Sequence, residues 1–320
     1  MDARITKQRL SNLISYDWLK MLVTILVFVL VLVLLFTMTA TRPRKDQEFA
    51  IYAHTDLQTD RVFSSLGDTL EEKKVFSYDI LSVTTEGFSG NNYASATFTA
   101  RRAAGQGTVM FMTDNPTYKK DENGNDVLDE NGERVIETQS ELYQFAAGAI
   151  DENSITLGAV YDTEYYFSLC EDYLVQFFGD DWATSDALDG VRTVEESFAR
   201  NEKDKRYRSD ESKAQGLEDE RERVLQLRED YIAVQKAFDE GKLSHTVYEF
   251  EEDSKTYEKS LGINVGRLNL LKNLVYYTDS AGARTTQNVN LVIFYNNYLD
   301  GADLCFETVS LLRYLVETYQ

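Results

Sequence analysis

The chain has 320 residues, with 33 Lys or Arg against 54 Asp or Glu, and a formal net charge of −21 at pH 7. Subtracting the seven basic and two acidic residues of positions 1–45 leaves 26 and 52, so the remainder carries −26. A field of this sign repels nucleic acid and anionic lipid, which excludes nucleic acid as a partner. The 37 Tyr and Phe residues exclude a disordered stalk, so this part is expected to fold.

Residues 21–40 contain no charged side chain and are apolar around the whole helical circumference. As a helix they span about 30 Å, which matches the hydrocarbon thickness of a bilayer. The segment is longer than the apolar part of a cleaved signal peptide, although Thr39 and Ala40 form a weak cleavage-like ending. We expect residues 1–20 to be a cytoplasmic tail, 21–40 a transmembrane helix that anchors the chain in the membrane, and 41–46 a linker.

The basic residues that flank this segment give a small orientation signal. Four precede it and three follow it within residues 1–45. The positive-inside rule therefore favours a cytoplasmic N-terminus by a narrow margin, and Tyr16 and Trp18 suit the membrane interface. The expected localisation is the bacterial cell membrane, single-pass, with an acidic domain at 47–320 on the extracytoplasmic side.

Strand and helix patterns alternate between residues 47 and 114. In chain order we expect a short strand from 48 that ends near His54, a helix at 60–74 with Asp60 as N-cap, a strand at 75–83, a helix at 91–107 and a strand at 108–114. Strands that alternate with helices of this length predict right-handed crossovers and a parallel sheet. The predicted fold class is therefore α/β.

Residues 114–140 form a polar segment in which the phrase Asp-Glu-Asn-Gly occurs twice, at 121–124 and 129–132. Asn-Gly pairs are typical of tight hairpin turns. A calcium loop is the alternative, but an EF-hand needs glycine at its sixth position and glutamate at its twelfth, where Asp126 and Gly132 stand. We expect a solvated hairpin insertion and no metal site.

A charged helical insertion is expected at 193–241. Leu217, Val224, Tyr231 and Phe238 recur every seven residues, which is a heptad pattern. One interpretation is a coiled-coil dimer contact, which would give a protein partner. The other is a helix packed on its own domain, and it is favoured because three heptads are marginal for a free coiled coil. Around this insertion the sequence also predicts a helix at 164–179, a strand at 288–299 and a closing helix at 302–319.

The sequence carries no recognisable catalytic motif. It has no nucleophile elbow, no zinc-protease helix and no phosphate-binding glycine loop, and its only histidines, His54 and His245, lie far apart. Cys170 and Cys305 lie in apolar settings that favour buried thiols, and a bridge between them stays open. We therefore expect no enzyme activity and no cofactor.

Ligands of parallel α/β sheets bind at the carboxyl ends of the strands, which gives a candidate small-molecule site. His54 and Asp56 follow the first predicted strand, Phe88 follows the second, and Asp114 ends the third. Tyr93 is an aromatic side chain that could stack on a ligand. Ordinary turn chemistry is the alternative for each of these residues.

Three stretches resemble a known family. "FAIYAHTDL", "NNYASATFTARRAAGQGTVMFMTD" and "LVIFYNNYLDGADLCFETVSLLRYLVE" are similar to segments of the type 2 periplasmic solute-binding proteins of bacterial ABC importers. The resemblance implies a two-lobed α/β domain with a ligand cleft between the lobes. The leading hypothesis is a diverged, membrane-anchored solute-binding-like protein. The alternative is a surface structural or protein-interaction module that uses the heptad helix and has no small-molecule cleft.

Overall fold

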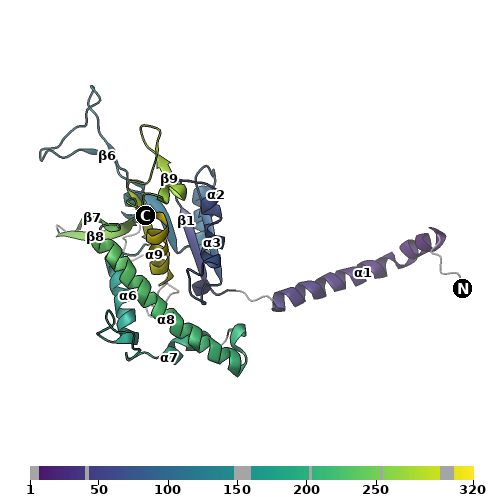
Figure 1. Cartoon of the computed structure of the whole chain (residues 1–320). Helices are drawn as coiled ribbons and strands as arrows, with labels where there is room; N and C mark the ends of the chain where they lie inside the picture. The colour runs from purple at the N-terminus through teal and green to yellow at the C-terminus, as the bar shows by residue number, and fades with distance from the viewer. Residues whose placement is uncertain (1–6, 40–42, 148–159, 202–203, 253–254, 296–305) are drawn as a thin grey trace. The chain divides into compact units, whose positions relative to one another are not determined.

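A computed structural model describes residues 7–39, 43–147, 160–201, 204–252, 255–295 and 306–320 (Figure 1). The chain divides into two compact units, Met1–Arg42 and Pro43–Gln320. The first contains one long helix, α1 (Lys7–Thr39). Its segment Trp18–Thr37 has a mean hydropathy of 3.1, so α1 is long and apolar enough to cross a membrane.

The second unit is built on a mixed six-stranded sheet in the order β3-β1-β4-β11-β8-β7. Its strands are β1 (Glu48–Ala53), β3 (Ser82–Gly87), β4 (Val109–Thr113), β7 (Ser244–Glu252), β8 (Lys255–Asn264) and β11 (Val289–Ile293). The pairs β1–β3 and β1–β4 are parallel, whereas β4–β11, β11–β8 and β8–β7 are antiparallel. The predicted α/β class and parallel order are therefore confirmed for the first half of the sheet.

The crossovers of the parallel half cover opposite faces of the sheet. Between β1 and β3 the chain forms α2 (Arg61–Ser64) and α3 (Leu66–Glu72), and between β3 and β4 it forms α4 (Ala94–Ala103). Phe63 of α2 packs in the main core with Ile51 of β1, whereas Phe98 of α4 packs on the opposite face with Tyr52. Because β3 and β4 flank β1 on its two sides, right-handed crossovers require this arrangement. The predicted N-cap is also confirmed, since the Asp60 carboxylate accepts from the Val62 amide.

The strand predicted at 75–83 is wrong. The chain turns there, with a hydrogen bond from the Ile80 amide to the Ser77 carbonyl, and the strand begins only at Ser82. The reason is that Tyr78 and Asp79 turn toward polar partners in the helical insertion. The alternation of apolar residues in this segment therefore reflects a packed loop.

A long hairpin, β7 and β8, extends the sheet on the antiparallel side and was not predicted. β8 pairs with β11 only at Ile263 and Asn264, so most of the hairpin has no further strand neighbour. β11 lies where the strand at 288–299 was predicted, although residues 296–299 lie outside the described residues. A small antiparallel sheet of β2 (Gln58–Thr59), β9 (Val275–Thr278) and β10 (Arg284–Thr285) also forms.

The segment after β4 contains two successive tight turns, as predicted. β5 (Thr117–Tyr118) and β6 (Ile136–Thr138) pair at its base. The Asp121 carboxylate accepts from the amides of Asn123 and Asn125, and Asp129 accepts likewise in the second turn. Both turn glycines adopt positive φ, which explains the Asn-Gly pairs.

Three helices form the main layer against the sheet: α6 (Thr163–Phe178), α8 (Asp210–Asp239) and α9 (Glu307–Tyr319). The short α5 (Glu141–Ala147) lies on the other face with α4, and α7 (Val194–Phe198) precedes α8. On α8, Val224, Leu227, Tyr231 and Val234 are buried in the core of their own domain. The heptad pattern therefore describes an intramolecular seam.

A network of buried charges joins the helical insertion to the rest of the domain. Glu220 is fully buried on α8 and accepts from Arg223, Ser197 and Tyr78, with Arg200 3.4 Å away. Burial alone would raise the pKa of this carboxyl, but the arginines and hydrogen bonds lower it to about 2. Glu220 is therefore ionised at neutral pH.

Residues 43–320 form one compact unit, and the described residues show no division into two lobes. Cys170 is a fully buried thiol, and burial raises its pKa. Cys305, the other cysteine of the bridge considered from the sequence, lies outside the described residues.

Candidate functional site

The carboxyl ends of β1 and β4 meet at a topological switch point. The chain leaves β1 toward α2 and α3 on one face, whereas after β4 and the β5–β6 segment it forms α5 on the other. Loops diverge at such a point, which is where open α/β sheets bind ligands. His54, Asp56 and Asp114, three of the residues predicted for ligand binding, lie here.

His54 and Asp56 form one hydrogen-bonded cluster with Thr113. The Nδ1 of His54 lies 3.0 Å from Asp56 Oδ1, while Asp56 Oδ2 accepts from the backbone amide of Thr113 at 2.8 Å and from its hydroxyl at 2.6 Å. Burial alone would raise the pKa of Asp56, but these hydrogen bonds outweigh it and hold the pKa below its usual value. The carboxylate is thus ionised and engaged on both oxygens.

Asp114 accepts a hydrogen bond from the hydroxyl of Tyr248 on β7, and Ser140 lies 3.3 Å from the same hydroxyl. Burial and the contact with Asp114 raise the pKa of Tyr248 well above its ordinary value, so the phenol stays neutral. Sequence analysis missed Tyr248, although Tyr248 and Phe250 alternate with glutamates in the manner of a strand. The switch point is therefore closed mainly by contacts among its own side chains.

The other two predicted ligand residues do not join this cluster. Phe88 is only 2% exposed and packs against Tyr52 and Phe98, so it belongs to the core between α4 and the sheet. Tyr93, immediately before α4, is 76% exposed. The structure therefore brings together three of the five predicted ligand residues and leaves Phe88 no surface for a ligand.

A hollow of about 570 Å³ lies elsewhere, on the α4 face of the parallel strands. Its floor and sides come from alternate residues of β1 and β3 and from the turn that follows α4. The lining includes Lys45, Glu48, Tyr52, Ser82, Thr84, Glu86, Arg101 and Gln106. These residues share one face because side chains of a strand alternate between its two sides.

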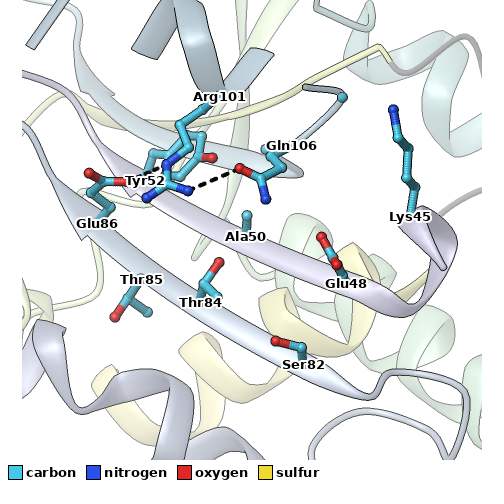
Figure 2. Close-up of a pocket in the computed structure, with 12 residues that line it drawn as sticks. Lys45, Glu48, Ala50, Tyr52, Ser82, Thr84, Thr85, Glu86, Arg101 and Gln106 are labelled. Atoms are coloured by element: carbon cyan, nitrogen blue, oxygen red, sulfur yellow. Dashed lines mark hydrogen bonds and ion pairs between the residues drawn. The ribbon is translucent and has the colours of Figure 1, made fainter. Parts of the chain in front are cut away.

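Opposite charges stand at two ends of this hollow. Figure 2 shows Arg101, Glu86 and Gln106 together at one end, and Glu48 and Lys45 toward the other. Arg101 Nε donates to Glu86 at 3.1 Å and Nη1 donates to Gln106 at 3.2 Å. Among the described residues, Arg101 Nη2 and the Glu48 carboxylate have no hydrogen-bond partner. The hollow thus has the Arg101–Glu86 pair at one end, and the Glu48 carboxylate with Lys45 on the lining at the other.

Tyr52 forms an uncharged part of the floor of the hollow. Burial raises the pKa of Tyr52 to about 12, so its phenol is neutral at physiological pH. Gly107 has a φ of +103°, and a Cβ there would lie 2.8 Å from the Tyr52 ring. The turn can therefore approach the floor this closely only with glycine.

This arrangement supports binding through polar contacts. Within the described part of the chain, no group of three or more His, Cys, Asp or Glu side chains could hold a metal ion. Sequence analysis missed the hollow because β3 was placed too early in the chain. The alternation of Ser82, Thr84 and Glu86 was the available signal.

Comparisons of this chain with protein-family models, with curated proteins and with solved structures found no match.

Proposed function

We propose that this protein is a single-pass membrane protein that holds a non-enzymatic binding domain outside the bacterial cytoplasmic membrane. The ligand is a small zwitterionic solute, such as an amino acid, and it binds in the hollow beside α4. The observation that carries the proposal is the separation of Arg101 from Glu48 across that hollow. The apolar α1 and the resemblance of the parallel strands to solute-binding proteins support the anchored binding role.

The chemistry of the lining matches the two ends of such a solute. A guanidinium presents donors in a fork that fits a carboxylate, and a glutamate accepts from an ammonium group. Arg101 already contacts Glu86, so a ligand carboxylate would add to this pair at the Nη2 side. Thr84 and Ser82 supply hydroxyl groups between the two ends. In this proposal the ligand binds one sheet face, whereas the two-lobed cleft implied by the resemblance is not needed.

The orientation is testable separately. A protease added to intact spheroplasts should degrade residues 43–320, which this proposal places outside, and should spare a tag fused before residue 1. The reverse pattern would contradict the extracytoplasmic placement.

The second candidate is an interaction module that binds a protein partner through the heptad helix. Val224 and Tyr231 are buried in the core of their own domain. A partner that binds through the heptad seam is therefore disfavoured. Only the outward faces of α8 are left for a partner.

The test is thermal unfolding of the full chain in lipid nanodiscs against a panel of amino acids, short peptides, sugars and polyamines. A ligand at 100 times its Kd stabilises the folded state by about 2.7 kcal/mol, or about 5 °C for a unit of this size. The variant Arg101→Gln should lose the shift. Arg134→Gln is the matched control, because Arg134 has a comparable exposure of 54% against 46% for Arg101 and lies in the hairpin insertion. A shift that survives Arg101→Gln, or no shift from any amino acid, would refute the proposed ligand class.

A further inference from the structure

A groove with an apolar floor runs between α8 and the loop that follows α3. It consists of two neighbouring hollows of about 540 and 470 Å³, and Lys74 and Gln226 line both of them. Gln226 on α8 donates to the carbonyl of Val75 at 3.2 Å and ties the two walls together where the hollows meet. The groove continues past this point to α9, which contributes Arg313 and Tyr314.

The floor exposes apolar side chains to solvent. Leu70 and Phe76 are buried beneath it, whereas Ile80, Leu81 and Val83 line it and are only half-buried. Half-buried aliphatic side chains that line a groove mark a surface on which an apolar partner gains by excluding water.

The α8 wall of the groove is acidic. Asp219, Glu222 and Glu229 stand on one side of the helix, separated by three and seven residues, so they form a stripe along the groove. Glu222 is exposed and has no ion-pair partner among the described residues. Asp219 accepts only from the neutral amide of Gln215, and Glu229 lies 4.0 Å from Arg313. This stripe is the outward face of the helix whose other side forms the buried seam.

The two arginines of the groove have carboxylate partners that are closer than those of this wall. Arg223 is buried and paired with Glu220, and Arg313 is paired with Asp230 at 2.6 Å. The remaining cations, Lys73 and Lys74, lie on the opposite side, and Lys73 stands over the Tyr314 ring. The stripe therefore adds to the field of a domain with a large net negative charge, which steers cationic partners toward it.

We propose that this groove binds a basic peptide segment of a partner protein, one that carries aliphatic side chains beside its lysines or arginines. The aliphatic side chains lie on Ile80, Leu81 and Val83, and the basic side chains face Glu222 and Glu229. The proposal concerns a surface separate from the hollow beside α4 and does not depend on the solute proposed there.

The test uses the full chain in phosphatidylcholine nanodiscs, with empty nanodiscs as a blank. The probe is a short fluorescent peptide of lysines with two leucines, and a second peptide has both leucines replaced by serine. Anisotropy at physiological ionic strength should show binding of the leucine peptide and about tenfold weaker binding of the serine peptide. Equal binding of the two peptides would overturn the proposal, because the floor would then contribute nothing.

Three variants separate the groove from the general field of the domain. Glu222→Lys with Glu229→Lys should weaken the leucine peptide by about tenfold or more. Val83→Thr, a mild change on a strand, should weaken it several-fold with an unchanged unfolding midpoint. Asp239→Lys changes an exposed carboxylate of the same helix away from the groove and should alter binding by less than about twofold. Equal losses in Asp239→Lys and in the groove variants would show a non-specific charge effect and overturn the proposal, as would unchanged binding in the Glu222 and Glu229 variant.

Discussion

Replacing Glu220 by glutamine should destabilise the folded domain by about 3 kcal/mol at pH 7. The pKa of Glu220 falls from an ordinary value of 4.5 to about 2 in the folded protein. Each unit of pKa corresponds to about 1.4 kcal/mol, so the gap corresponds to about 3 kcal/mol. The loss of one partner from a buried ion pair gives a cost of similar size, about 3–5 kcal/mol, because Arg223 would stay buried without the carboxylate of Glu220.

The pH dependence of this free-energy difference is a more specific test than its value at pH 7. Because the folded pKa lies below the unfolded one, the stabilisation by Glu220 is present above pH 4.5 and is lost as the pH falls toward 2. A protonated Glu220 resembles the glutamine variant. The difference in unfolding free energy between the two proteins should therefore shrink from about 3 kcal/mol at pH 7 to near zero at about pH 2.

Urea unfolding of the full chain in nanodiscs, followed by tryptophan fluorescence, measures this difference. Trp182 packs against the Tyr231 ring of α8 at 5.3 Å and reports on the same part of the domain. The control is Glu218→Gln, which makes the same substitution at an exposed position of the same helix. This variant should unfold like the parent at every pH. A difference below about 1 kcal/mol at pH 7, or one that does not change with pH, would refute the reasoning that Glu220 is a buried, ionised centre of the network.

Three further changes follow from the same geometry. Glu307→Gln should raise the unfolding free energy at pH 7, because burial raises the pKa of this carboxyl and so disfavours its ionised form in the folded state. The gain should disappear below about pH 4, where the carboxyl is protonated in the folded and the unfolded state alike. An equal gain at both pH values would contradict this. Asp56→Asn should cost about 1–3 kcal/mol in the same urea assay, since it removes the ionised acceptor of the Thr113 amide and hydroxyl. Leu227→Ala should cost about 2–5 kcal/mol and leave the sedimentation coefficient unchanged, and a change in oligomeric state would show that the heptad seam joins two chains.

Short-range patterns predicted two strands of the parallel half, β1 and β4, but misplaced β3. β1 and β4 are buried on both faces, so they appear in the sequence as continuous apolar runs such as Phe49–Ala53 and Val109–Met112. Asp60 as N-cap and the Asn-Gly turns were readable for the same reason, because their hydrogen bonds join residues a few positions apart.

Long-range partners explain what the sequence left out. Tyr78 and Asp79 turn away from a strand because they contact Asn201 and Arg200. These partners lie more than 120 positions further along the chain, so short-range patterns do not reveal them. Tyr248 of the candidate site was not predicted for the same reason, because it lies 134 positions from its partner Asp114. The β7–β8 hairpin was within reach of pattern analysis, because its residues alternate between aromatic and acidic.

The short turn at the start of the second unit determines how a mechanical load would enter the domain. Arg44 donates to Asn201 at 2.8 Å, and Gln47 donates to Asp204 at 3.2 Å, just before β1 begins. A pull on the chain at Pro43 would therefore stretch polar contacts with the helical insertion before it reached the central strand. Tension applied at Pro43 would thus be divided between the sheet and a helical segment some 157 positions away.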